Sequence, residues 1–279
     1  PLLWKNRDTD FMRNHVDYVK GERYDFIAVV NSANAYLKEA WMGTNSAGFA
    51  LMNTQSYNLV DVKGDEERGA ANGRVIYRAL EVCATVEDFC HFLDTISKPS
   101  DIEANFGVID AQGGAAMFEV DYYKYVMYDA NNPKDAPYGY IARTNFSFAG
   151  KVNEGAGYVR YMEADQVLMK ASATGNITPQ FIFNDLSRSF RNRMLDIDLR
   201  SGGYNRPQAS GWFIDQDFIP RSSTSCSVVV GTGGKTGCEG RTDYHVDPVR
   251  VSSYRYSCPA VGERCRKTPS WNGTFQQRT

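Results

Sequence analysis

The sequence predicts an α+β fold, organised as one domain over residues 1–230. Strand-like segments come in runs, then helical segments, then a last strand, which differs from the regular strand–helix alternation of α/β folds. No internal repeat or linker interrupts these residues. Hydrophobic residues make up 42% of the 279-residue chain, as in an ordinary globular protein, which argues against a disordered, collagen-like or coiled-coil chain.

In the first half of the chain, strands are predicted over residues 1–4, 24–31 and 47–53. A helical stretch follows over residues 69–97. Its second half begins at Thr85, a suitable N-cap, and Asp88 three residues later completes a weaker form of the capping box. Apolar residues then recur at helical spacing, at Phe89, Phe92, Leu93 and Ile96.

In the second half, further strands are predicted over residues 105–110, 115–121, 122–128 and 138–146. One helix is predicted over residues 158–171. Another begins with Thr178 as N-cap and Pro179 at the first helical position. Its apolar face is predicted to carry Ile182, Leu186 and Phe190. The last strand is predicted over residues 222–230.

Residues 231–279 differ from the rest of the chain in composition. They contain no Leu, Ile or Met, and they carry eight Lys and Arg against four Asp and Glu, compared with 23 against 29 in residues 1–230. Three of the six cysteines, Cys238, Cys258 and Cys265, lie here. Because such a segment buries little apolar surface, we expect an aberrant, disordered tail.

Charge and hydropathy exclude two classes of protein. The formal net charge is −2, which gives no general electrostatic case for a nucleic-acid partner. No uninterrupted apolar run approaches the ~18 residues that a membrane-spanning helix needs. We therefore expect no nucleic-acid partner and no membrane span.

The spacing of the candidate residues does not by itself identify a catalytic mechanism. Arg7 and Asp10 lie three apart in a charged segment directly after a predicted apolar strand, and such a segment is typical of a solvated turn. Asn53 ends an apolar strand and Asn145 lies inside a predicted one; a buried amide needs partners, so a structural hydrogen bond is the simpler interpretation of both. No histidine or cysteine has partners at metal-ligand spacing, and no cofactor is expected.

Five blocks of sequence, taken together in order and spacing, resemble one superfamily. They are residues 1–10 (PLLWKNRDTD), 41–53 (WMGTNSAGFALMN), 107–116 (GVIDAQGGAA), 143–146 (RTNF) and 221–225 (RSSTS). The set resembles the linear amide C–N hydrolases, N-terminal-nucleophile (Ntn) enzymes that include choloylglycine hydrolase, penicillin V acylase and acid ceramidase-like amidases. Within them it is most similar to the acyl-coenzyme A:6-aminopenicillanic acid acyltransferase-like group. The resemblance covers about residues 1–230.

The resemblance implies a four-layer αββα fold and a small-molecule amide substrate. It also implies a catalytic cysteine that is the first residue after processing, whose thiol attacks the amide carbonyl while its own α-amino group acts as general base. An amine with a pKa near 8 suits that role at neutral pH. No cofactor or metal is implied, and a homo-oligomer is compatible with the family.

The resemblance also assigns roles to five residues. Arg7 and Asp10 match an Arg-x-x-Asp pair, in which the guanidinium favours the thiolate and orients substrate while the carboxylate holds the α-amino group. Asn53 and Asn145 are implied to supply oxyanion and amine contacts. Arg221 matches a family arginine near the site.

The chain departs from the family pattern at both ends. Relatives carry a Cys-Thr-Ser-like start upstream of the equivalent of Pro1, so we expect a fragment whose parent has the nucleophile and which is inactive as it stands. Cys83, Cys90 and Cys226 do not lie where they could replace it. At the other end, permissible codons for residues 241–262, read one nucleotide later, give patterns like the family's closing strands. We expect a frameshift between about residues 227 and 241.

Alternatives stay open at this point. Acyl transfer to an amine passes through the same acyl-enzyme as hydrolysis. A non-catalytic binding module that kept the fold without the nucleophile is the rival class. Bile salts, acyl-homoserine lactones, penicillins and N-acyl amines are all compatible substrates.

Overall fold

A computed structural model describes residues 1–33, 35–61, 69–201, 217–232, 242–247 and 254–258 of the chain. Its strands are β1 (Leu2–Asp8), β2 (Asn14–Val19), β3 (Phe26–Asn31), β4 (Met42–Asn45), β5 (Ala50–Gln55), β6 (Ala104–Ile109), β7 (Ala115–Val120), β8 (Tyr125–Asp129), β9 (Arg191–Asn192), β10 (Ile197–Asp198), β11 (Thr224–Thr232), β12 (Thr242–Asp247) and β13 (Tyr254–Cys258). Its helices are α1 (Asn72–Val82), α2 (Val86–Thr95), α3 (Tyr158–Ala173), α4 (Pro179–Phe181), the 3₁₀ turns η1 (Ala35–Leu37) and η3 (Leu199–Ser201), and the π-helical turn η2 (Ile182–Leu186).

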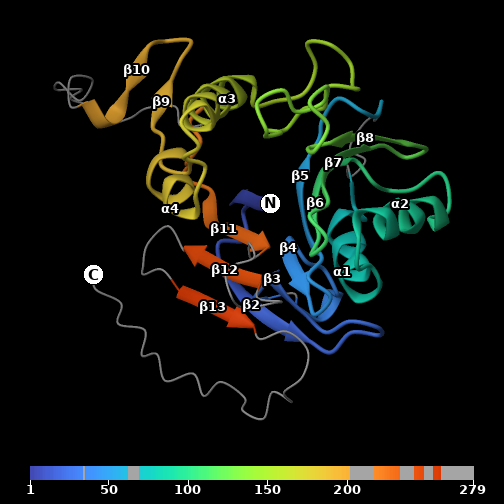
Figure 1. Cartoon of the computed structure of the whole chain (residues 1–279). Coiled ribbons are helices and arrows are strands. Elements are labelled where there is room, and N and C mark those ends of the chain that lie inside the picture. The colour runs from blue at the N-terminus through green and yellow to red at the C-terminus, as the bar shows by residue number, and fades with distance from the viewer. Residues whose placement is uncertain (34, 62–68, 202–216, 233–241, 248–253, 259–279) are drawn as a thin grey trace.

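Within the described residues, the strands form two large antiparallel sheets and the small hairpin β9–β10 (Figure 1). The seven-stranded sheet runs in chain order from β2 to β8. The four-stranded sheet has the order β1-β11-β12-β13, and Trp4 of β1 pairs with Val229 of β11. Residues from both ends of the chain therefore share the four-stranded sheet.

Three apolar clusters show that the sheets and helices form four layers. The first cluster lies between α1 and α2 and one face of the seven-stranded sheet, where Ile76 and Phe89 meet Phe106. The second lies between the two sheets and includes Leu3 and Val228. The third packs α3 and η2 on the outer face of the four-stranded sheet. The expected αββα arrangement is confirmed.

The predicted N-caps explain where two helices begin. The Thr85 hydroxyl accepts from the Asp88 amide at 3.0 Å, and the Asp88 carboxylate accepts from the Thr85 amide at 3.1 Å, which completes the capping box of α2. The Thr178 hydroxyl accepts from the Phe181 amide at 3.1 Å. Helical structure after Thr178 ends at Leu186, so Phe190 lies outside the helix that was predicted to carry it.

The strand predicted over residues 138–146 is wrong. The segment makes only an isolated bridge, between Asn145 and Ala156. Its carbonyl oxygens accept hydrogen bonds from side chains instead of from a neighbouring strand: Thr144 O accepts from Thr54 Oγ1 at 3.0 Å and Phe146 O from Asn105 Nδ2 at 3.0 Å. Hydrogen bonds from side chains thus replace the main-chain hydrogen bonds between strands that the apolar pattern predicted.

Within the expected tail, β12 pairs with β11 and β13 pairs with β12, and both pairs are antiparallel. The rest of the tail, residues 233–241, 248–253 and 259–279, lies outside the described residues. The frameshift stays a prediction.

Candidate functional site

Strand β1 places two positive charges between the sheets. Successive side chains of a strand point to opposite faces, so Leu3, Lys5 and Arg7 share one face of β1. Leu3 belongs to the cluster between the sheets, together with Met52 and Met117 of the seven-stranded sheet. Lys5 and Arg7 therefore point toward the seven-stranded sheet.

Lys5 connects the two sheets through two hydrogen bonds. Its Nζ donates to the main-chain oxygen of Trp41 at 3.0 Å and to Oδ1 of Asn53, on β5, at 2.8 Å. Burial, reinforced by the neighbouring charge of Arg7, lowers the pKa of Lys5 from 10.5 to about 7. The site therefore holds this ammonium at a cost.

Arg7 is held from several sides and is 4% exposed. Its guanidinium donates to Oδ1 of Asn31, on β3, at 2.7 Å and to Oδ1 of Asn14, on β2. It also lies over the Trp41 ring, 4.9 Å from the centroid, which is cation–π geometry. Burial lowers the pKa of Arg7 to about 10. These contacts fix the guanidinium in one orientation.

No carboxylate of the described residues contacts the positive charge at this site, although the charge of Asp8 offsets, from a distance, part of the burial effect that lowers the pKa of both Lys5 and Arg7. In the described part of the chain, the hydrogen-bond acceptors of Lys5 and Arg7 are all uncharged oxygens, and no carboxylate forms an ion pair with either. Arg7 is buried and Lys5 is half-buried, and charges in such places are usually paired. The region therefore favours an anion that arrives from outside this set, such as a thiolate or a tetrahedral oxyanion.

Asn145 lies beside the strand that carries Asn53. Its Nδ2 donates to the main-chain oxygen of Gln55 at 2.9 Å, and its Oδ1 accepts from Arg160 Nη2, on α3, at 2.8 Å. Burial and the nearby charge of Arg221 lower the pKa of Arg160. Both ends of the Asn145 amide are thus occupied by partners within the fold.

Asp8, which the sequence analysis did not single out, holds Arg221. Its Oδ2 accepts from Arg221 Nε at 3.0 Å and from Nη2, and its Oδ1 accepts from the Thr224 hydroxyl. Asp10 is exposed, and among the described residues no hydrogen bond or ion pair reaches its carboxylate. The structure brings Arg7 and Asn53 together around Lys5 and Trp41, and it leaves Asp10 apart from them.

The three cysteines with described side chains are not activated nucleophiles. All are free thiols, and burial raises the pKa of Cys226, of Cys90 and, to about 12, of Cys83. A nucleophilic cysteine needs the opposite shift. Cys83 packs in the cluster on the far side of the seven-stranded sheet, whereas Cys226 lies between the sheets, where Arg7 and Lys5 only partly offset the effect of burial.

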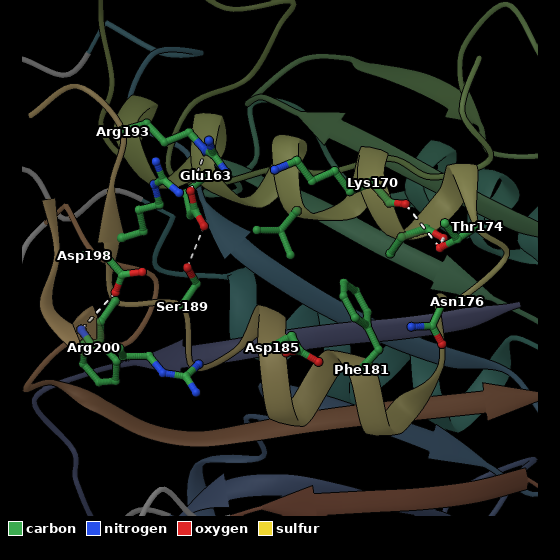
Figure 2. Close-up of a pocket in the computed structure, with 14 residues that line it drawn as sticks. Glu163, Lys170, Thr174, Asn176, Phe181, Asp185, Ser189, Arg193, Asp198 and Arg200 are labelled. Carbon is green, nitrogen blue, oxygen red and sulfur yellow. Dashed lines mark hydrogen bonds and ion pairs between the residues drawn. The ribbon is translucent and has the colours of Figure 1, made fainter. Parts of the chain in front are cut away.

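A separate cavity of about 530 Å³ lies between α3, the α4–η2 segment and the β9–β10 hairpin (Figure 2). None of the five predicted site residues lines it. Its wall includes the buried Glu163, which binds Arg193 at 2.6 Å and accepts from the Ser189 hydroxyl at 2.6 Å. Phe190, predicted on a helix face, lines this cavity instead.

The described ranges contain neither a membrane-spanning helix nor a metal site. No helix there is long and apolar enough to cross a bilayer. No group of three or more His, Cys, Asp and Glu side chains in those ranges is arranged to hold a metal ion.

Sequence reasoning missed Lys5, Asn31 and Arg160. One signal could have identified Lys5: it alternates with Leu3 and Arg7 along a strand, which predicts a lysine on the inward face. The partners of Arg160 and Asn31 lie 15 or more positions away, and spacing gives no signal for them.

Comparison with known proteins gives both a sequence match and structural likenesses. A profile of the acyl-coenzyme A:6-aminopenicillanic acid acyl-transferase family matches residues 3–183. A mutant of conjugated bile acid hydrolase from Clostridium perfringens is similar with a TM-score of 0.48 at 12% identity, over 92% of this chain and 88% of that one. Penicillin V acylase from Agrobacterium tumefaciens is similar with a TM-score of 0.45 at 15% identity, over 92% and 82%.

An N-acylethanolamine-hydrolyzing acid amidase ortholog from Caenorhabditis elegans is similar with a TM-score of 0.42 at 14% identity, over 66% of this chain and 83% of that one. No curated protein matches the chain. The family profile spans four of the five predicted site residues, Arg7, Asp10, Asn53 and Asn145, and ends before Arg221. Since it covers more than half of the chain, the protein belongs to the acyl-coenzyme A:6-aminopenicillanic acid acyl-transferase family.

Proposed function

We propose that the protein is an Ntn amidase that cleaves the C–N bond of a small linear amide through a cysteine acyl-enzyme. The observation that carries this proposal is the convergence of Arg7, Lys5 and Asn53 between the sheets, in a chain of the acyl-transferase family. Positive charge that no carboxylate of the described residues contacts, beside a buried amide, suits a reaction that develops negative charge on sulfur and then on oxygen.

In this reaction the thiol adds to the amide carbonyl and gives its proton to its own α-amino group. The carbonyl oxygen becomes an oxyanion, and Asn53 is the donor that meets it. The C–N bond then breaks, and the leaving amine takes up the proton. Water or a second amine attacks the acyl-enzyme, which releases an acid or a new amide and regenerates the thiol.

The nucleophile in this proposal is an N-terminal cysteine encoded upstream of Pro1. The raised pKa values of Cys83, Cys90 and Cys226 support this assignment, because a buried thiol that stays protonated is a poor nucleophile. Arg7 favours the thiolate. Arg221, Asn145 and Asp10 complete the proposed site, with Asp10 holding the α-amino group once that group is present.

Two proteins test the proposal: this chain, and the chain extended by the codons that precede Pro1. Each is incubated with N-acyl amines, N-acyl amino acids, a penicillin and a conjugated bile salt, and release of free amine is measured. We expect amine release from the extended, self-processed protein, blocked by iodoacetamide, and none from this chain. A folded extended protein that cleaves no amide would support the binding module instead.

The same assay separates hydrolysis from acyl transfer. Adding a second primary amine diverts the acyl group to a new amide if the acyl-enzyme accepts amines. Mass spectrometry of the products then reports the ratio of new amide to free acid.

A further inference from the structure

The contact between Lys5 and Asn53 restricts how the Asn53 amide can point. Lys5 Nζ lies 2.8 Å from the side-chain atom of Asn53 that faces it and 3.0 Å from the Trp41 main-chain oxygen. While Lys5 is protonated, below about pH 7, its ammonium has three donors and no acceptor, so the facing atom of Asn53 is its oxygen. The NH₂ group of Asn53 is thereby directed away from Lys5.

This NH₂ group is an unused donor in a nearly buried residue. Asn53 is 4% exposed, and within the described ranges its Nδ2 makes no hydrogen bond. Asn145 differs, because its Nδ2 donates both to the Gln55 main-chain oxygen and, at 3.4 Å, to Thr54 Oγ1, and its Oδ1 accepts from Arg160. Of the two asparagines, only Asn53 can offer an N–H to a substrate oxygen without first breaking a bond of its own.

Among the described residues, Lys5 is the one hydrogen-bonding partner of the Asn53 side chain that selects this orientation of its amide. A side-chain amide is nearly symmetric in shape, so a half-turn about its last bond would present Oδ1 to the substrate carbonyl, where two oxygens repel. Burial lowers the pKa of Lys5 to about 7, so the lysine occupies this place at a cost in stability. A residue that serves packing alone would be expected to be apolar here.

We propose that Lys5 is a positioning residue that holds the Asn53 amide with its N–H donors toward the substrate carbonyl. This inference rests on the proposed function. It adds a residue that acts through Asn53 and does not itself touch the reacting atoms.

A double-mutant cycle in the extended, self-processed protein tests the proposal. The variants are Lys5→Met, Asn53→Ala and the two combined, with Lys20→Met as a matched control at an exposed lysine. We expect Asn53→Ala to lower kcat about 100-fold. We expect Lys5→Met to lower kcat about 10-fold with little change in KM, and the double variant to match Asn53→Ala. Lys5→Arg, which keeps N–H donors, retains more kcat than Lys5→Met, and Lys20→Met retains all of it.

The same variants are unfolded in urea, which reports the contact independently of catalysis. Coupling between Lys5 and Asn53 in both kcat and the urea midpoint supports the proposal. If the two substitutions are coupled in the urea midpoint but their effects on kcat are fully additive, the proposal is overturned. Lys5 would then contribute to the stability of the fold without acting on catalysis through Asn53. Absence of coupling in urea also overturns it, because the contact itself would be missing. If the wild-type protein cleaves no amide although the urea coupling is present, the proposed function fails and the role of Lys5 fails with it.

Discussion

At the scale of single residues, the site is defined by two positive charges that no carboxylate of the described residues contacts. Lys5 and Arg7 meet only uncharged oxygens in the described residues, whereas Asp8, on the opposite face of β1, pairs with Arg221. Asp8 is thus in an ion pair with Arg221, whereas the inward Lys5 and Arg7 are influenced by the charge of Asp8 without contacting it. The inward charge lowers the stability of the fold. It becomes favourable when an anion forms beside it, because the positive charge then stabilises that anion.

Replacing Lys5 tests this cost through its dependence on pH. The folded-state pKa of Lys5, about 7, lies below its ordinary value of 10.5, so the unfolded chain binds a proton more readily than the folded one. The penalty is complete below about pH 7 and fades as pH rises toward 10.5. We expect Lys5→Met to raise the free energy of unfolding by a few kcal/mol near pH 6 and by much less near pH 10. Urea unfolding at the two pH values measures this, and an equal gain at both would contradict the burial of a charged lysine.

At the scale of secondary-structure elements, close packing of β4 positions Trp41. Gly43, on β4, lies two residues after Trp41, whose oxygen and ring contact Lys5 and Arg7. A Cβ at Gly43 would lie 2.5 Å from the main-chain oxygen of Ile27, on β3, and 2.7 Å from Leu80, on α1. Only glycine allows β3, β4 and α1 to approach this closely.

Gly43→Ala is therefore expected to destabilise the fold by about 3 kcal/mol, because backbone in β3 must move to accommodate the methyl group. Gly175→Ala is the matched control: an added Cβ there meets nothing within 4 Å, and only the positive φ of 62° is unfavourable. We expect the control to cost about 1 kcal/mol. Thermal unfolding compares the two variants. Equal losses would show that Gly43 is not needed for close packing.

The sequence predicted elements well where one physical pattern dominated. The buried strands β6 and β7 and the capped helix α2 matched expectation because apolar runs, a tight turn and a capping box act locally. β2 was missed because its polar and apolar residues carry no strong alternation, and only its pairing with β3 makes it a strand. The strand prediction for residues 138–146 was wrong because side chains 39 or more positions away donate hydrogen bonds to this segment in place of a neighbouring strand.

At the scale of the whole molecule, the four layers explain why the candidate site could be predicted only in part. The αββα arrangement puts β1 against β5, so residues 48 positions apart, Lys5 and Asn53, meet between the sheets. The resemblance identified Arg7 and Asn53, which the structure brings to one place. Strand alternation can place Lys5 on the inward face, but its bond to Asn53 is a contact between sheets, which no local pattern encodes.

Trapping of an acyl-enzyme is the direct test of catalysis through an N-terminal cysteine. The extended, self-processed protein would be mixed with an N-acyl substrate, quenched in acid within milliseconds to seconds, and measured by intact-mass and peptide mass spectrometry. We expect a mass increase equal to the acyl group on the N-terminal cysteine, which disappears on longer incubation as acid or new amide accumulates. A protein that releases amine with no acyl adduct on that cysteine, or one acylated at another residue, would contradict it.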